Sequence, residues 1–177
     1  MSQMYNKAYG LKIIVTRMFS HEGSRRGKLF ALSNFAFQIV QHEKEYESSQ
    51  KWLNPGDEAP EYVIKVGNLD SVRTYNHISD AVRAYWLIAT KGKIGEVYNI
   101  GGNYTCTVKD ALEKLLNKSF ISRDKFMIVV DPKRIRPTDI TLQIPDYTKF
   151  KNDTGWEPQK GLNEIVDDLL SYWRCKL

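Results

Sequence analysis

The sequence predicts an α/β fold, in which strands and helices alternate along the chain. Residues 11–19 are rich in β-branched side chains and almost continuously apolar, which is typical of a strand buried on both faces in a parallel sheet. Apolar residues within 29–40 and 162–173 instead recur at helical spacing, so each of these segments has one face to bury. A continuous apolar run in one segment and helical spacing of apolar residues in the others together indicate helices packed on a parallel sheet.

The remaining elements follow from local signals. Residues 2–9 are expected to be the end of a helix that stops at Gly10. A second helix is expected to begin at Asp80, with an apolar stripe that includes Trp86. Short apolar runs bounded by turn residues predict three further strands, at 62–66, 96–100 and 126–130.

Two more segments complete this description of the chain. Thr107 lies where a helix N-cap is expected, and Asp110 three residues later makes a variant of the capping box. The segment 43–60 is polar and contains Pro55 and Pro60, so we predict a loop there. We find no internal repeat and no low-complexity segment.

Composition narrows the functional classes. The 177 residues are 42% hydrophobic and 12% aromatic, enough to bury a core and to argue against disorder. A net charge of +5 allows an anionic ligand, but the basic residues form no stripe, so we predict no nucleic-acid partner. No apolar run approaches the roughly 20 residues that cross a bilayer, so we predict no membrane partner.

Cysteine and histidine usage argues against a metal site. Cys106 and Cys175 form no C-x-x-C pair, and the histidines at 21, 42 and 77 lack the spacing of metal ligands. We therefore predict no metal and expect a reduced, cytoplasmic protein.

Several catalytic motifs are missing. The chain has no G-x-G-x-x-G after a strand, no P-loop and no G-x-S-x-G elbow. Gly101 and Gly102 follow a strand without a third glycine, so we interpret them as a strand-to-helix turn. No Tyr-x-x-x-Lys pair or other general acid or base is recognisable, so we assign no catalytic residue.

Basic residues supply the positive signal. Arg25, Arg26 and Lys28 lie between a predicted strand and a predicted helix, where open α/β sheets place ligands and where helix N-termini accept phosphate. Arg73 and Arg136 lie on two other predicted loops, and planar guanidinium groups that converge could hold a diphosphate. The alternatives are a solvated basic turn and ordinary surface salt bridges.

Six segments, taken in order, resemble the GDP-mannose 4,6-dehydratases, extended short-chain dehydrogenase/reductases that act on nucleotide sugars. They are RMFSHEGSRRG (17–27), VGNLDSVR (66–73), DAVRAYW (80–86), GEVYNIGG (95–102), RPTD (136–139) and TGWEP (154–158). The resemblance covers nearly the whole chain. The related GDP-6-deoxy-4-keto-mannose reductases share many of these motifs, so the resemblance is less specific for the substrate.

The resemblance implies a partial enzyme. It implies the last strands of a Rossmann-like parallel sheet plus the small C-terminal substrate-binding α/β domain, with the glycine-rich half and its Tyr-x-x-x-Lys pair absent. We accordingly expect residues 1–42 to be a remnant of the nucleotide-binding domain and the start of the substrate domain. Residues 43–60 are expected to be an inserted loop, and residues 61–177 the nucleotide-sugar domain.

The resemblance also implies roles for single residues. His21 and Arg26 match positions that contact the NADP cofactor, and Ser20 stands where the family usually has an asparagine that binds the substrate phosphates. Arg73 and Arg136 match arginines that hold the diphosphate, and Asp139 matches an acidic position that binds the ribose. Three residues at the same mouth are further substrate-binding candidates: Arg25, Lys28 and Asn34.

The function expected from this resemblance is the nucleotide-sugar-binding portion of a GDP-mannose 4,6-dehydratase-like enzyme, inactive alone. In the complete enzyme, NADP would take hydride from C4 of the sugar, water would leave across C5–C6, and hydride would return to C6. A separately encoded Rossmann half and a homo-oligomer are the expected partners. The alternatives are a stand-alone nucleotide-sugar-binding module, part of a related reductase, part of a UDP- or dTDP-sugar epimerase, or a non-functional remnant.

Overall fold

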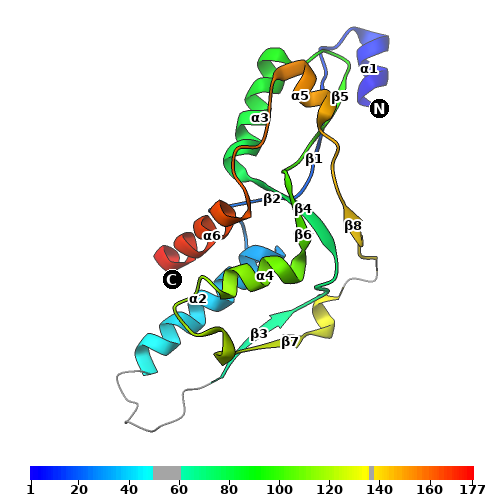
Figure 1. The fold of residues 1–177 in the computed structure, drawn as a ribbon. Helices are drawn as coiled ribbons and strands as arrows, with labels where there is room; N and C mark the ends of the chain where they lie inside the picture. The colour runs from blue at the N-terminus through cyan, green and yellow to red at the C-terminus, as the bar shows by residue number, and fades with distance from the viewer. Residues whose placement is uncertain (50–60, 136–137) are drawn as a thin grey trace. The chain divides into compact units, whose positions relative to one another are not determined.

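The computed structural model describes residues 1–49, 61–135 and 138–177 (Figure 1). These residues belong to two compact units, each assembled from three separate stretches of chain. Unit 1 comprises Met1–His21, Arg73–Thr105 and Gln143–Leu162, and unit 2 comprises Glu22–Val72, Cys106–Leu142 and Asn163–Leu177. The chain therefore passes between the units five times.

Unit 1 is built around a parallel strand pair. Its elements are α1 (Ser2–Tyr9), β1 (Val15–Met18), α3 (Ile78–Lys91), β5 (Val97–Ile100) and α5 (Thr148–Thr154). Val15 lies opposite Val97 and Met18 opposite Ile100, so β1 and β5 run in the same direction. The core consists of small and aromatic side chains from α3, β5, α5 and the turn after it, namely Ala84, Ile88, Tyr98, Ile100, Phe150 and Trp156.

Unit 2 also contains a parallel pair. Its elements are α2 (Ala31–Ser49), β3 (Tyr62–Val66), α4 (Val108–Leu116), β7 (Phe126–Val130) and α6 (Leu162–Lys176), together with two short 3-10 helices at Arg123–Lys125 and Pro132–Arg134. Tyr62 lies opposite Phe126 and Val66 opposite Val130. Every second residue of β3 is buried, and α2, α4 and α6 bury apolar stripes that include Ile39, Leu112 and Leu169.

Four short strands lie where the chain changes units: β2 (His21–Glu22), β4 (Val72–His77), β6 (Tyr104–Thr107) and β8 (Leu142–Gln143). Their order is β2-β4-β6, and β8 pairs with β4. The sequence did not predict them, because they are brief and mostly polar and carry no alternating apolar signal.

The predicted α/β fold is confirmed in most elements. Strands β3 and β7 have the predicted bounds, and α1 ends at Gly10, whose φ of 67° is left-handed. Both bonds of the capping box form, with Thr107 Oγ1 accepting from the Asp110 amide and Asp110 Oδ2 accepting from the Thr107 amide.

Three predictions of structure need correction. The first is the loop at 43–60, because residues 43–49 are the last turns of α2, where Glu43 is buried; residues 50–60 lie outside the described part of the chain. The strand expected at 11–19 is only four residues long, and Leu11 is exposed. Asp80 lies in the first turn of α3, whose N-cap is His77.

Candidate functional site

The loop after β1 carries most of the predicted ligand-binding residues. Ser20 Oγ donates to Gln143 Oε1 at 3.4 Å, and the Ser20 carbonyl accepts from the Asn76 amide at 2.9 Å. His21 Nδ1 donates to the Phe19 carbonyl at 3.1 Å, because a carbonyl oxygen can only accept. These contacts lie within unit 1, so Ser20 and His21 have fixed places there.

The basic part of the loop belongs to unit 2. Arg25 is exposed and has a φ of 68°, a conformation that costs energy for a residue with a Cβ. The Arg26 guanidinium carbon lies over the Phe30 ring, 3.3 Å from its centroid, which is a cation–π contact. Ser33 Oγ donates to the Arg26 carbonyl at 2.6 Å, which ties the loop to α2.

A buried carboxyl group beside Arg26 escaped sequence reasoning. Glu22 is 6% exposed, and its Oε2 lies 3.7 Å from Arg26 Nε, too far for a hydrogen bond. Within the described residues, neither of these two atoms has a hydrogen-bond partner. Burial raises the pKa of Glu22 to about 7, and the Arg26 charge opposes that rise. The available signal was a lone acidic residue between the strand and the basic run.

We expect the stability of the chain to fall between about pH 4.5 and pH 7 because of Glu22. In that range the unfolded chain has lost the Glu22 proton while the folded chain retains it, so rising pH favours unfolding. The difference between a pKa of 4.5 and one of about 7 corresponds to about 3 kcal/mol of folding stability, and this stability is lost completely above the folded pKa.

Urea unfolding of the natural chain and of Glu22→Gln across this pH range tests the expectation. The glutamine variant should gain stability relative to the natural chain as pH rises. Glu47→Gln, at an exposed position of α2, is the control and should follow the natural chain. Parallel curves for all three proteins would show that Glu22 ionises normally.

Two of the further substrate-binding candidates, Lys28 and Asn34, are in contact with each other in unit 2. Asn34 Nδ2 donates to the Lys28 carbonyl at 2.8 Å, and Arg134 donates to Asn34 Oδ1 at 2.6 Å. The Lys28 ammonium lies 4.9 Å from the centroid of the Phe37 ring. Arg134 was not singled out from the sequence, and it now links the start of α2 to the segment after β7.

Asp139 is held by the turn that follows β3. Its Oδ2 accepts from Asn68 Nδ2 at 2.9 Å and from Ser71 Oγ at 2.8 Å. The same turn contacts Arg134, because a Cβ on Gly67 would lie 2.6 Å from the Arg134 carbonyl oxygen. In unit 2 the structure therefore connects Asp139, the 67–71 turn, Arg134 and Asn34, which is a continuous polar cluster.

Of the two arginines predicted to hold a diphosphate, only Arg73 lies in the part of the chain that the structure describes. Arg73 lies in β4 within unit 1 and is half-buried. Arg136 lies outside the described residues, so its convergence with Arg73 stays a prediction. Asn76 on the same strand is fully buried, and within the described part of the chain neither polar atom of its side chain has a hydrogen-bond partner.

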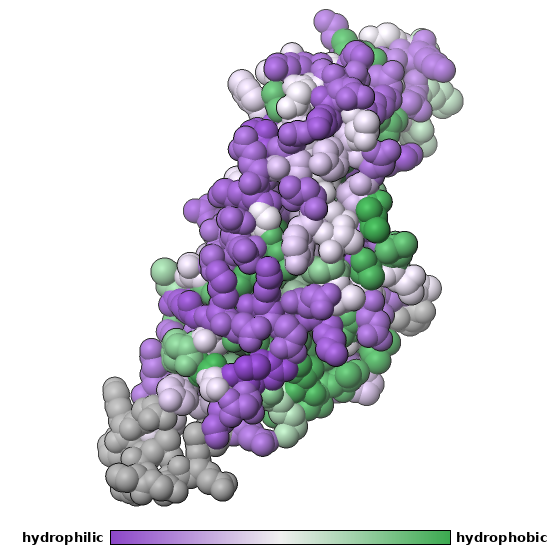
Figure 2. Space-filling view, viewed as in Figure 1, coloured by the Kyte–Doolittle hydropathy of each residue, from purple (hydrophilic) through white to green (hydrophobic). Residues whose placement is uncertain are grey.

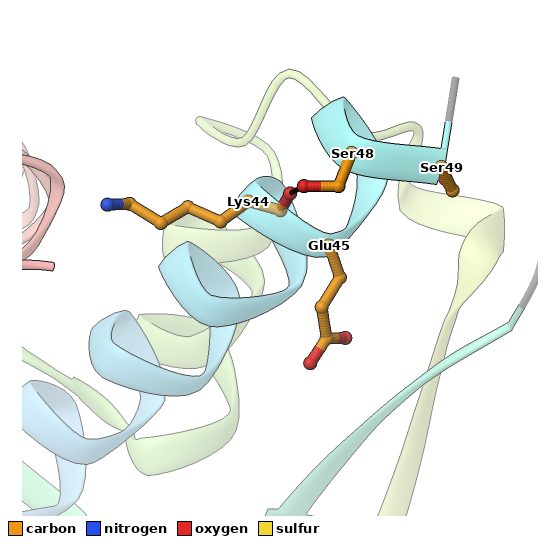
Figure 3. A pocket seen from close by; sticks show the side chains of 4 residues that line it. All are labelled: Lys44, Glu45, Ser48 and Ser49. Atoms are coloured by element: carbon orange, nitrogen blue, oxygen red, sulfur yellow. Dashed lines mark hydrogen bonds between the residues drawn. The ribbon is translucent and has the colours of Figure 1, made fainter. Parts of the chain in front are cut away.

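Other features contribute no further chemistry. A shallow depression on the solvent side of α2 is lined by Lys44, Glu45, Ser48 and Ser49, and it contains none of the predicted site residues (Figure 3). Over residues 1–49, 61–135 and 138–177, no three histidine, cysteine or acidic side chains gather as metal ligands would. No helix in the same residues has both the length and the apolarity to cross a membrane.

Comparison with known proteins places these features in a family. The family model of GDP-mannose 4,6 dehydratase matches residues 1–169. The chain is 23% identical to the GDP-6-deoxy-D-mannose reductase of Pseudomonas aeruginosa, over 95% of this chain and 50% of that protein. It is 25% identical to the human GDP-mannose 4,6 dehydratase, over 94% of this chain and 45% of that protein.

A solved structure agrees with the fold. The structure of RMD from Pseudomonas aeruginosa complexed with NADPH superposes with a TM-score of 0.82 at 20% identity, over 99% of this chain and 53% of that one. The α/β architecture is therefore that of a partial Rossmann-like protein, and the chain spans about half the length of the relatives it matches. With the family model matching nearly its entire length, the chain belongs to the GDP-mannose 4,6 dehydratase family.

Proposed function

We propose that this chain is the nucleotide-sugar-binding portion of a GDP-mannose 4,6-dehydratase-like enzyme. The family match over residues 1–169 carries the proposal. The complete enzyme would convert GDP-mannose to GDP-4-keto-6-deoxymannose, and this portion would supply binding contacts without the reaction itself. The polar cluster of unit 2 supports the proposal, because Asn68 and Ser71 both donate to Asp139 Oδ2 and fix the place of this carboxylate.

The binding roles follow from side-chain chemistry. Arg73 and Arg136 would grip the diphosphate, since guanidinium groups bind phosphate oxygens in pairs. Asp139 would accept hydrogen bonds from ribose hydroxyl groups. Ser20 in unit 1, and Arg25, Lys28 and Asn34 in unit 2, would be further contacts to the nucleotide sugar.

The loop after β1 also fits a nicotinamide cofactor. Arg26 is stacked on Phe30 and keeps a buried Nε–H without a hydrogen-bond partner in the described chain, so it suits an anionic group such as a cofactor phosphate. His21, whose Nδ1 is bonded to the Phe19 carbonyl, would be a second contact to the cofactor. NADP, when bound, supplies the acceptor and later the donor of hydride. Positioning its phosphate is the task that Arg26 would perform.

Calorimetry with GDP, GDP-mannose, UDP and dTDP tests the assignment. We expect guanine nucleotides to bind best, and Arg73→Ala to weaken binding at least tenfold, because a charged hydrogen bond to phosphate is lost. Lys44→Ala, which removes an exposed positive charge from α2, should bind normally. Equal affinity for the natural chain and Arg73→Ala would show that the diphosphate lies elsewhere.

An activity assay shows whether this chain is a portion of an enzyme or an enzyme that is complete by itself. The purified 177 residues should show no turnover of GDP-mannose with NADP, and turnover above a blank without protein would contradict the proposal. The second candidate, a stand-alone nucleotide-sugar-binding module, predicts tight binding by this chain alone. An enzyme portion predicts binding that strengthens when the other half of a relative is added.

The compartment and assembly are also proposals. The described cysteines, Cys106 and Cys175, form no disulfide, and burial raises the pKa of the Cys106 thiol to about 11. The absence of a disulfide between these two described cysteines supports the proposed reduced, cytoplasmic setting. We further propose that the complete enzyme is a homo-oligomer.

A further inference from the structure

The buried carboxyl group of Glu22 in unit 2 has no part in the binding roles proposed above. Hydrophilic side chains dominate the face of the molecule drawn in Figure 2, as expected where charged groups remain in contact with water. Glu22 is an exception at 6% exposed, and within the described residues its Oε2 atom accepts no hydrogen bond. Burying such a group is costly, and unsatisfied buried groups often mark functional sites.

The loop between Glu22 and α2 is closed so that Glu22 and Arg26 are neighbours. The Arg26 amide donates to the Gly23 carbonyl at 3.2 Å, and Ser33 Oγ donates to the Arg26 carbonyl at 2.6 Å. These bonds hold the turn in which Arg26 Nε lies 3.7 Å from Glu22 Oε2. An approach closer by roughly 1 Å would make this separation a charged hydrogen bond. The two groups are therefore adjacent without being bonded.

The Arg26 side chain has a buried part and an open part. Its Nε atom is buried and, in the part of the chain that the structure describes, donates to no acceptor. The side chain as a whole is 24% exposed, and its guanidinium carbon lies over the Phe30 ring. A ligand can therefore reach Arg26 from solvent while Nε stays close to Glu22.

Arg26 is the main charged neighbour of Glu22 in unit 2. Burial raises the pKa of Glu22 to about 7, and the Arg26 charge is the influence that opposes the rise. The other cations of the loop, Arg25 and Lys28, are exposed, and the stretch of α2 from 31 to 40 contains no titratable side chain. A change in the charge of Glu22 therefore acts first on Arg26.

The neighbouring strand residues include two histidines and an arginine. His21 precedes Glu22 on β2, and its Nδ1 donates to the Phe19 carbonyl. Strand β4, next to β2 in the strand order, carries Arg73 and His77, and the His77 side chain caps α3. All three groups remain in the variants described below, so their titration contributes equally to each protein.

We propose that Glu22 is a positioning residue that makes phosphate binding at Arg26 depend on one proton. With Glu22 protonated, the Arg26 charge is available to the anion. With Glu22 ionised, the carboxylate attracts the guanidinium group and repels the anion, so binding weakens. Because the coupling is reciprocal, a bound anion favours protonated Glu22, and a proton is taken up from solvent on binding. That the phosphate belongs to the cofactor rests on the proposed function.

Sulfate is the first probe, because this tetrahedral dianion keeps its charge throughout the titration and needs no nucleotide. An NMR titration should show that the natural chain binds sulfate about tenfold more tightly at about pH 5.5 than at about pH 8.5, since a nearby like charge is absent at the lower pH. Glu22→Gln, which is uncharged at both, should bind equally well at the two values. Glu47→Gln, at an exposed position of α2, is the matched control and should keep the natural pH dependence.

The NMR signal of the Glu22 carboxyl carbon reports the coupling in the natural chain itself. Its titration should move to higher pH when sulfate is added. It should also move to higher pH in Arg26→Ala, which removes the opposing charge, and sulfate should then cause no further movement. A purely structural role of Glu22 would not make its titration respond to sulfate.

Two further ligands distinguish the sources of the phosphate. NADP carries a phosphate group that NAD lacks, whereas both contain a diphosphate. A pH dependence seen with NADP alone assigns Arg26 to the additional phosphate, and a dependence seen with both ligands assigns it to the diphosphate. Either result agrees with the coupling to Glu22.

Three results would overturn the proposal. They are sulfate affinity that Arg26→Ala leaves unchanged, the same pH dependence in the natural chain and in Glu22→Gln, and a Glu22 titration that sulfate does not move. Since sulfate contains no nucleotide, a failure of GDP or GDP-mannose to bind would contradict the proposed function and leave these measurements unaffected. The two proposals therefore fail separately.

Discussion

Replacing Arg174 by alanine is expected to destabilise the chain by about 3–5 kcal/mol. Arg174 donates to both carboxyl oxygens of Glu43, at 2.8 and 2.7 Å, and Ser119 Oγ donates to the same carboxylate at 2.8 Å. The Glu43 side chain is only 2% exposed. Removing the guanidinium group would therefore leave a buried carboxylate with a single hydroxyl partner, which is far costlier than losing an exposed ion pair.

Urea denaturation measures this effect, and two variants sharpen it. Glu43→Gln should cost less than Arg174→Ala, because Arg174 is 39% exposed and can reach water. Asp167→Ala, which removes the partner of Lys118 from an exposed pair, should cost at most about 1 kcal/mol. If Arg174→Ala were as mild as Asp167→Ala, the Glu43 carboxylate would have to be in contact with solvent in the folded chain.

The second large effect is expected at Gly102, where alanine should abolish folding or cost more than about 4 kcal/mol. A Cβ there would lie 1.7 Å from the Tyr75 carbonyl oxygen and 2.9 Å from the Asn76 nitrogen. Both atoms are backbone atoms of β4, so no side-chain rotation can relieve the overlap. The main chain itself would have to move, and the strand pairing would be lost with it.

Soluble expression and circular dichroism of Gly102→Ala report the result directly. Gly27→Ala is the control, because nothing lies within 4 Å of a Cβ at that position. The control should unfold within about 1 kcal/mol of the natural chain. A well-folded Gly102→Ala protein would mean that β4 is separated from residue 102 in solution.

Local signals in the sequence recovered elements that are stabilised locally. The capping box at Thr107 and Asp110 and the strands at 62–66 and 126–130 each depend on a few neighbouring residues, so their bounds were predictable. The end of α2 was not predictable in this way. Glu43 resembles a loop residue in the sequence, because its ion-pair partner Arg174 lies 131 positions later. Strand β4 was missed for the same reason, since its partners are distant in sequence.

The candidate site shows a similar division. Residue types and family motifs indicated Arg26 and Asp139, but they could not reveal the groups that position them. The buried Glu22 near Arg26 and the Asn68 amide that donates to Asp139 became visible only in the structure. Gly102 looked like an ordinary turn residue, yet its lack of a side chain is required by the passage of β4 beside it. Such a close approach of two backbone segments does not alter the spacing of apolar residues, so the sequence pattern cannot reveal it.

The interleaving of the two units has a consequence for synthesis. Unit 1 is incomplete until residue 162 has been made, and unit 2 lacks most of α6 until residue 176 has been made. At roughly 5–20 residues per second, β1 waits several seconds or more for its partner β5, and longer for α5. Neither unit is encoded by one contiguous stretch of sequence, so neither can fold when only its first stretch has been synthesised. A nascent chain stalled before residue 162 should therefore bind chaperones and be sensitive to proteases.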